Sequence, residues 1–279
     1  MKIAIFSGGL FQLSKKRNLG DSVYKLESRL YEQLCLLRDR FSLCGIKAEF
    51  EAEGSSFRDL VRLRRLTLKA GVNLYLKIGG VEANRDIKDA LEIGVDGIIA
   101  PMVESRFGAK KFYDSLIKIY QNNKIFSTLN IETKSAISNL ESILEFAQGR
   151  VDSITIGRSD LSASYFDLEI KPDSDFILDL LEDMAKKVHA HHLKLAVGGG
   201  VSMQTIEKIN TFYPNLLNLI DRFETRKVML PTYIFLTKPE SIKEALVFEE
   251  LYILSKKEFS DLYIDSEITR LTELKRRLQ

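Results

Sequence analysis

The sequence predicts an α/β protein, a (β/α)8 barrel of the TIM type with a helical C-terminal extension. Three observations lead to this prediction. Short apolar runs alternate with longer stretches of helical periodicity, which is the pattern of a parallel sheet covered by helices. The apolar runs number about eight, as in a closed barrel of this kind. The chain has 279 residues, 45% of them hydrophobic, which is enough to bury such a core.

Each expected strand is short, apolar and bounded by polar or turn-forming residues. The expected strands are Lys2 to Phe6, Ile46 to Ala52, Asn73 to Ile78, Gly97 to Ala100, Ile125 to Ile131, Ser153 to Ile156, Leu193 to Val197 and Lys227 to Leu230. Between them, apolar stripes at helical spacing predict helices, one over Phe176 to Val188 and one over Ile137 to Leu144. Pro172 and Pro239 mark the starts of two further helical segments.

No linker rich in Pro, Gly or Ser divides the chain, so we expect a single domain over residues 1–279. The barrel is expected to occupy about residues 1–238, and the helical tail residues 239–279. This tail exceeds what closes a barrel, and we expect it to suit packing on a neighbouring subunit. The segment Ser7 to Gly20 is irregular, and we expect a loop or a mobile segment over the barrel mouth.

Composition narrows the function classes. With 41 basic and 39 acidic side chains the chain is nearly neutral, so we expect no nucleic-acid and no membrane partner. Two cysteines, Cys35 and Cys44, are too few for a disulfide framework and favour a reducing compartment. No apolar run reaches the roughly 18 residues of a membrane span, and Met1 to Phe6 is too short for a secretory signal. A cytoplasmic protein with a small-molecule ligand is expected.

Two carboxylates, Glu132 and Asp160, stand just past the ends of two consecutive predicted strands. The carboxyl ends of the strands of a parallel barrel surround its open mouth, where barrel enzymes keep their sites. Hard divalent cations are held by one or two acids together with water and substrate oxygens. The spacing therefore predicts a metal site at the mouth.

Lys77 and Glu51 also fall at strand ends. Three interpretations of Lys77 stay open: a clamp for a substrate carboxylate or phosphate, a structural ion pair, and a Schiff-base nucleophile. The last needs a depressed pKa, which the surrounding acids oppose. Two interpretations of Glu51 also stay open. In the first, Glu51 orients a metal-bound water or acts as a base; in the second, it forms an ion pair with a neighbour such as Lys47.

Three consecutive glycines, Gly198 to Gly200, follow the predicted strand ending at Val197. They suit either a simple turn or a seat for phosphate or another anion, because glycine lets a ligand approach the backbone amides. His189, His191 and His192 have the side chains of metal ligands. They precede the same strand, however, so we expect them on the surface of the opposite face of the barrel.

The segment from Val95 to Tyr165 resembles the HpcH/HpaI aldolase and citrate lyase family, whose members are metal-dependent barrels acting on pyruvate-like 2-oxo acids or acyl-CoA thioesters. The resemblance is carried by Gly94-Val-Asp-Gly-Ile-Ile-Ala-Pro-Met-Val-Glu104, Ile131-Glu-Thr133 and Gly157-Arg-Ser-Asp-Leu-Ser162. It implies Glu132 and Asp160 as ligands of Mg²⁺ or Mn²⁺.

The resemblance also implies a substrate-binding set at these strand ends. Asn130 takes the place of a polar residue near the substrate, and the Ser159 and Asp160 amides would donate to the pyruvate carboxylate. The remaining expected substrate contacts are Gly157, Glu104, Gly198 and Gly199. A homo-oligomer is expected by the same analogy.

Three positions depart from the family pattern. Where the aldolases have an acid-x-Glu-His motif, this chain has Glu49-Phe-Glu51-Ala52, and alanine cannot move a proton. Lys77 replaces an arginine that stabilises the enolate oxygen. Arg158 replaces a proline and is expected to grip a carboxylate or phosphate with two parallel hydrogen bonds.

We therefore expect a metal-dependent carbon-carbon lyase, or the reverse synthase. Its partners would be a 2-oxo acid or phosphoenolpyruvate and an aldehyde or sugar, with Lys77, Glu51 and Arg158 as the catalytic residues. Phosphoenolpyruvate would suit a site that lacks the histidine, since it needs no base. Two alternatives stay open: an acyl-CoA lyase, for which no adenine-binding cluster is evident, and a non-catalytic barrel that binds a metabolite or a partner subunit.

Overall fold

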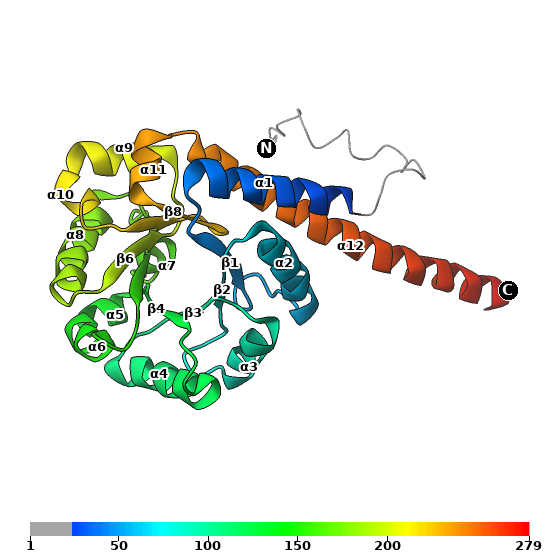
Figure 1. Cartoon of the computed structure of the whole chain (residues 1–279), viewed down its shortest axis with the longest axis horizontal. Coiled ribbons are helices and arrows are strands. Elements are labelled where there is room, and N and C mark those ends of the chain that lie inside the picture. The colour runs from blue at the N-terminus through cyan, green and yellow to red at the C-terminus, as the bar shows by residue number, and fades with distance from the viewer. Residues whose placement is uncertain (1–23, 279) are drawn as a thin grey trace.

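The computed structural model describes residues 24–278, which form a closed eight-stranded barrel surrounded by helices (Figure 1). The predicted fold class is confirmed. The strands are β1 (Gly45–Glu49), β2 (Leu74–Lys77), β3 (Gly97–Ala100), β4 (Phe126–Ile131), β5 (Ser153–Gly157), β6 (Lys194–Gly198), β7 (Arg222–Glu224) and β8 (Val228–Pro231). The helices are α1 (Lys25–Phe41), α2 (Phe57–Ala70), α3 (Asn84–Ile93), α4 (Arg106–Tyr120), α5 (Lys134–Ser138), α6 (Leu140–Ala147), α7 (Arg158–Ala163), α8 (Asp175–Ala190), α9 (Met203–Phe212), α10 (Pro214–Leu217), α11 (Thr232–Thr237) and α12 (Ser241–Leu278).

Hydroxyl side chains set where several helices begin. Ser56 accepts a hydrogen bond from the Asp59 amide, and the Asp59 carboxylate accepts one from the Ser56 amide, which closes a capping box at the start of α2. The hydroxyl groups of Ser105, Thr133 and Ser174 each accept a single hydrogen bond from a backbone amide at the start of α4, α5 and α8. These caps fix the points at which the chain turns from the strand-end loops into the outer helices.

The predicted strands from Ile46 onward correspond to β1 to β6 and to β8. The expected strand Lys2 to Phe6 and the expected loop Ser7 to Gly20 lie outside the described residues. The sequence analysis missed β7, because Arg222-Phe-Glu224 has one apolar side chain between two charged ones. Those two charges point into the barrel, where each finds a partner.

The last strand runs against the others. Each pair of neighbours from β1 to β7 is parallel, whereas β8 is antiparallel to both β7 and β1. A tight turn joins β7 to β8, with the Thr225 amide donating to the Val228 carbonyl at 2.9 Å. A hairpin needs no crossover helix, so the chain closes the barrel with a short reversal. This closure differs from the all-parallel barrel expected from the sequence.

The interior of the barrel has an apolar floor and a charged layer above it. Tyr75, Ile99 and Met229 form the floor, a small buried cluster separate from the main core. Glu224 accepts from Arg222 Nε at 3.1 Å and pairs with Lys47 Nζ at 3.4 Å. Burial alone would raise the pKa of Glu224, but Lys47 and Arg222 outweigh it and hold that pKa below its ordinary value.

The long helix α12 begins on the barrel and ends beyond it (Figure 1). Its first part packs beside α1, where Gln33 Nε2 donates to Glu244 Oε2 at 2.8 Å, and buries Phe248 and Leu251. Every residue from Tyr263 to Leu278 is exposed. Over the described residues, no helix combines the length and the apolar character needed to cross a membrane.

Candidate active site

Glu132 is the centre of the site. It follows β4 directly, and only 2% of its surface is exposed. Oε1 accepts a hydrogen bond from the Met102 amide at 2.9 Å, and Oε2 accepts one from Asn130 Nδ2 at 3.1 Å. Burial raises the pKa of Glu132 and the negative charge of Asp160 adds to the rise, against the opposing effect of Lys77. The site thus holds one carboxylate in a fixed orientation.

The backbone of the loop after β3 is shaped to make one of these bonds. Met102 has a φ of 49°, a left-handed conformation that is uncommon for a residue other than glycine. The next amide, that of Val103, donates to the Asn130 carbonyl at 3.1 Å, which ties the loop to β4. Left-handed backbone at such a residue is typical of functional sites. The sequence analysis did not single out Met102, and only its place inside the strand-end motif could have indicated it.

Gly157 provides the space that Glu132 occupies. A Cβ built on Gly157 would lie 2.6 Å from Glu132 Oε2 and 3.0 Å from Glu132 Cβ. Real Cβ atoms do not come that close, so any larger residue at the end of β5 would push the carboxylate aside. Gly157 was expected to contact substrate, and the structure shows in addition that it contacts the central acid.

Lys77 reaches the site from the end of β2. Its Nζ lies 2.9 Å from Glu51 Oε2 and 3.7 Å from Glu132 Oε1. Burial alone would lower the pKa of Lys77, but Glu132 and Glu51 outweigh burial and raise it. A lysine held in its charged form is a poor nucleophile, which argues against the Schiff-base interpretation. The ion pair considered for Glu51 was one with Lys47. In the structure Glu51 pairs with Lys77 instead, and Lys47 pairs with Glu224.

Asp160 stands in the first turn of α7, the short helix that follows β5. Its side chain is exposed, unlike that of Glu132, yet its charge is close enough to affect the pKa of Glu132. Ser159 is exposed beside it. The two acids predicted from the sequence are therefore brought together at the mouth, one buried and one open to solvent.

Arg158 lies in a different place from the one expected. It is fully buried, with Nε donating to the Gly198 carbonyl at 3.2 Å and Nη2 to the Gly199 carbonyl at 2.8 Å. Nη1 donates to the Pro172 carbonyl at 3.3 Å and to the Asp173 carboxylate. With all three guanidinium nitrogens bound to protein, Arg158 fastens the glycine loop after β6. This placement corrects the expectation that it grips a substrate anion.

The glycine loop packs tightly on the start of α7. Gly199 has a φ of 82°, and a Cβ built on it would lie 2.4 Å from the Ser159 nitrogen. Only glycine allows both that conformation and that approach. The carbonyls of Gly198 and Gly199 are taken by Arg158, so this loop serves to position the Ser159 segment.

The remaining predicted residues lie around the rim. Glu104 is exposed, and its Oε1 accepts from Thr133 Oγ1 at 2.7 Å. Glu53 is paired with Lys227, a buried lysine that the sequence pattern did not single out. His189, His191 and His192 lie at the end of α8, at the opposite face as expected, with His191 Nε2 3.4 Å from Glu141.

The donor chemistry of the mouth fits a hard divalent cation. Within residues 24–278 no group of three or more His, Cys, Asp or Glu side chains has a metal-binding arrangement. Protein ligands would thus be the two carboxylates Glu132 and Asp160, which is a common set for Mg²⁺ when water and substrate oxygens complete the shell. Asn130 Oδ1 is also buried there, with no hydrogen-bond partner among the described residues.

Comparison with known proteins bears on the family and the fold. Residues 63–195 match the family model described as HpcH/HpaI aldolase/citrate lyase. A search of curated protein sequences gives no significant match.

Among solved structures, three similar ones show the same fold. An HpcH/HpaI aldolase from Desulfitobacterium hafniense DCB-2 has 18% identity and a TM-score of 0.52, over 63% of this chain and 77% of that one. The citrate synthase SbnG has 17% identity and a TM-score of 0.55, over 83% and 90%. An HpcH/HpaI aldolase/citrate lyase family protein from Burkholderia cenocepacia J2315 has 13% identity and a TM-score of 0.54, over 77% and 90%. The resemblance predicted from the sequence is confirmed by the match of residues 63–195 to the HpcH/HpaI aldolase/citrate lyase model, a family whose name denotes lyase or aldolase activity.

Proposed function

We propose that this protein is a divalent-metal-dependent carbon-carbon lyase, or the reverse synthase. It would act on a 2-oxo acid or phosphoenolpyruvate together with an aldehyde or sugar. The observation that carries the proposal is the cluster at the barrel mouth, in which a buried Glu132 lies 3.7 Å from a charged Lys77 and close to Asp160. Anionic substrates with a chelating keto oxygen suit a site that combines two metal-type ligands with a cation.

In this proposal Glu132 and Asp160 hold Mg²⁺ or Mn²⁺. When bound, the cation would act as a Lewis acid that draws charge from the keto and carboxylate oxygens of the substrate. Glu132 is oriented for this role by the Met102 amide and by Asn130. Because the carboxylate is buried and cannot turn away, little conformational entropy is lost when Glu132 becomes a metal ligand.

Lys77 stabilises the negative charge that develops on the substrate when the carbon-carbon bond breaks or forms. Glu51 holds the ammonium group toward the mouth through its 2.9 Å contact. Glu51 is partly exposed and is the proposed base where a proton must move, because Ala52 stands where the family has histidine. Phosphoenolpyruvate would make that base unnecessary.

Substrate contacts are proposed for Asn130, for the Ser159 and Asp160 amides, and for Glu104 at the rim. Gly157, Gly198 and Gly199 shape the pocket by allowing close packing. We propose a positioning role for Arg158, which holds the Gly198 and Gly199 carbonyls. The organisation proposed for the chain is a single barrel domain with a helical tail. We propose that it acts in the cytoplasm, and the unpaired state of Cys35 and Cys44 agrees with this.

Calorimetric titration of the metal-free protein with Mn²⁺ tests the proposal, first alone and then with pyruvate or phosphoenolpyruvate present. We expect Mn²⁺ to bind and the acid to tighten the binding. Glu132→Gln should abolish both effects, whereas Glu207→Gln on the exposed face of α9 should change neither. Full Mn²⁺ affinity in Glu132→Gln would contradict the assignment.

A second measurement separates catalysis from binding. Metal-dependent exchange of the pyruvate methyl protons in deuterated water, followed by proton NMR, would support the lyase. Metal binding without exchange for any 2-oxo acid tested would favour the alternative of a barrel that binds a metabolite.

A further inference from the structure

Lys227 lies on the mouth side of the barrel because β8 runs against the other strands. In a barrel of parallel strands, the residue before a strand lies at the face opposite the mouth. Because β8 is antiparallel to β1, the residue before Val228 lies on the mouth side instead. The Lys227 carbonyl accepts a hydrogen bond from the Lys47 amide at 2.7 Å, which fixes its backbone against β1. The reversed strand therefore adds a lysine to this side of the barrel.

The Lys227 ammonium group is enclosed between the loop after β1 and the helix α12. Nζ donates a hydrogen bond to Glu53, and it lies 4.3 Å from the centre of the Tyr252 ring. Only 2% of the Lys227 side chain and 10% of the Glu53 side chain are exposed. Burial lowers the pKa of Lys227, and Glu53 opposes that effect. Each member of this pair thus compensates the buried charge of the other.

Glu53 belongs to the same tight turn as Glu51, the proposed base. The Glu51 carbonyl accepts a hydrogen bond from the Gly54 amide at 3.1 Å, and the Glu49 carbonyl accepts one from the Ser55 amide at 3.4 Å. Gly54 has a φ of 52°, a left-handed conformation that suits glycine. Because these bonds tie the turn into one unit, a displacement of Glu53 carries Glu51 with it.

Lysines beside the two strands that flank β1 hold this turn from opposite sides. Lys77 at the end of β2 pairs with Glu51 at 2.9 Å, and Lys227 before β8 pairs with Glu53. An anionic substrate at Lys77 would compete with Glu51 for the ammonium group. The enclosed pair of Lys227 and Glu53 is not open to that competition, so it can hold the turn while substrate is bound.

We propose that Lys227 is a positioning residue, which through Glu53 keeps Glu51 beside Lys77 at the mouth. The proposal rests on the function proposed above, in which Glu51 moves the proton. Without Lys227, Glu53 would be a buried carboxylate with no compensating charge, and it would turn toward solvent. The turn would then take Glu51 away from Lys77.

Two further carboxylates near Lys227 add to this effect. Glu49 is 5% exposed, and its negative charge acts on Lys227 as that of Glu53 does. Burial raises the pKa of Glu249, Lys227 opposes the rise, and Glu53 adds to it. Removing the ammonium group would therefore leave several carboxylates that repel one another around Glu53.

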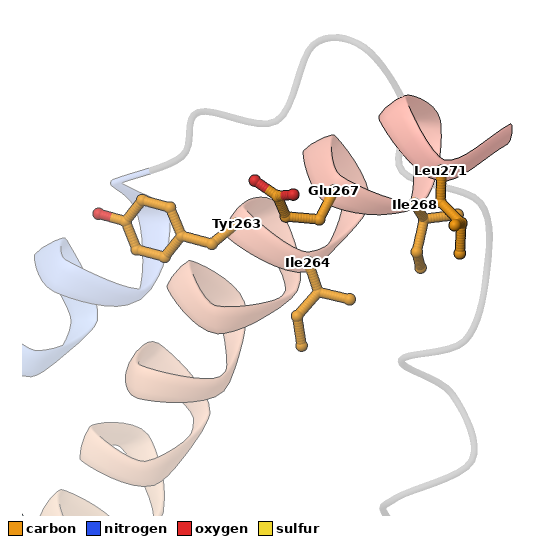
Figure 2. A pocket seen from close by; sticks show the side chains of 5 residues that line it. All are labelled: Tyr263, Ile264, Glu267, Ile268 and Leu271. Atoms are coloured by element: carbon orange, nitrogen blue, oxygen red, sulfur yellow. The ribbon is translucent and has the colours of Figure 1, made fainter. Parts of the chain in front are cut away.

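The part of α12 that packs on the barrel closes this arrangement. Tyr252, whose ring covers Lys227, is 6% exposed. Tyr263 lies about 16 Å further along the helix, at 1.5 Å per residue. There, Figure 2 shows a shallow hollow lined by Tyr263, Ile264, Glu267, Ile268 and Leu271. That hollow is beyond the reach of the Lys227 side chain, so it takes no part in holding the turn.

Hydrogen-deuterium exchange of backbone amides, measured by mass spectrometry, tests the positioning without any reaction. We expect the amides of residues 50–56 to exchange at least about ten-fold faster in Lys227→Met, because the turn is released. The double variant Glu53→Gln/Lys227→Met has neither charge of the pair and should exchange within about two-fold of the wild type. Unchanged exchange in Lys227→Met, or equal rates in the single and double variants, would overturn the proposal.

Two controls separate release of the turn from general damage. Lys256→Met removes a lysine that lies 5.8 Å from the centre of the same Tyr252 ring, and it should leave exchange at residues 50–56 unchanged. Residues 177–188 of α8 report unfolding of the whole barrel. Equal acceleration there in Lys227→Met would contradict a local role.

Metal-dependent exchange of the pyruvate methyl protons shows what the position of Glu51 does for the reaction. Lys227→Met should lower kcat at least about ten-fold and leave KM and Mn²⁺ affinity within about two-fold, since neither metal ligand belongs to the turn. The double variant should recover most of the rate. Mn²⁺ affinity that falls as much as kcat would contradict the proposal. A wild-type protein without methyl exchange would instead contradict the proposed function, and the amide exchange would still decide whether Lys227 holds the turn.

Discussion

Lys77 Nζ lies 3.7 Å from Glu132 Oε1, although the two residues come from the ends of strands that are not neighbours in the barrel. The contact crosses the mouth in front of β3 and places a permanent cation beside the acid expected to bind metal. A cation so close to a metal ligand works against metal binding while it favours an anionic substrate. A change at Lys77 should therefore shift metal affinity and substrate affinity in opposite directions, which binding measurements can detect.

Lys77→Met should separate the two effects. Mn²⁺ should bind as tightly as in the wild type or more tightly, because a positive charge beside the ligands is gone. Pyruvate should bind at least about ten-fold more weakly, the effect expected for one lost charged hydrogen bond. Titration calorimetry measures both, with Lys88→Met on the exposed face of α3 as the control. Unchanged pyruvate affinity would show that Lys77 serves only as a structural ion pair.

Metal affinity should fall on acidification at a higher pH than for an ordinary glutamate. Burial raises the pKa of Glu132 above its usual 4.5, and only the ionised carboxylate binds metal. Because this pKa is higher in the folded than in the unfolded state, protonation of Glu132 does not itself unfold the protein. Mn²⁺ titrations at a series of pH values, with circular dichroism at each, check this. Affinity that stays constant down to the ordinary glutamate pKa would contradict it.

Gly157→Ala should impair metal binding without a large loss of stability. The new Cβ would meet Glu132 Oε2 at 2.6 Å and turn the carboxylate from its bonds with Met102 and Asn130. Gly80→Ala is the matched control, since a Cβ there meets nothing within 4 Å. We expect at least ten-fold weaker Mn²⁺ binding for Gly157→Ala and none of this loss for Gly80→Ala. Equal affinities would show that the carboxylate adapts.

Arg158→Lys should behave as a stability variant. Lysine cannot reproduce the bonds of a guanidinium to two carbonyls and a carboxylate, so we expect unfolding free energy to fall by about 2–4 kcal/mol. Urea denaturation measures the loss. The alternative, in which Arg158 contacts the substrate, predicts normal stability and weaker binding of pyruvate or phosphoenolpyruvate.

Glu224→Gln should destabilise the protein in a pH-dependent manner. Lys47 and Arg222 hold the pKa of Glu224 below its ordinary value, so its contribution to stability is complete above the unfolded pKa near 4.5 and disappears as pH falls through the lower folded value. Removing one member of such a buried network costs about 3–5 kcal/mol at neutral pH. The difference from wild type should shrink in acid. Denaturation at several pH values measures it, and a pH-independent difference would contradict the ionised state of Glu224.

The strands that could be predicted from the sequence, β1 to β6 and β8, each contain at least two apolar side chains within a short segment bounded by polar or turn-forming residues. The sequence could not indicate β7, since two of its three residues, Arg222 and Glu224, are charged. Both are buried inside the barrel, where the Glu224 carboxylate pairs with Arg222 and with Lys47. With three residues and a single apolar side chain, Phe223, β7 is too short to show a hydrophobic period. The reversal of β8 was equally hidden, because strand direction depends on the length of the connection and not on the apolar pattern.

The sequence by itself determined the fold class, the family resemblance and the positions of the two mouth acids, since these depend on local patterns and on motifs at strand ends. Only the tertiary structure decided which hydrogen-bond and ion-pair partners the site residues have. It joined Lys77 to Glu51 and Glu132, and it directed Arg158 into the protein, where its three nitrogens meet carbonyl and carboxylate oxygens from distant segments. A side chain at a strand end can face the mouth or the surrounding loops. Which of the two it does depends on hydrogen-bond partners that come together only when the barrel closes.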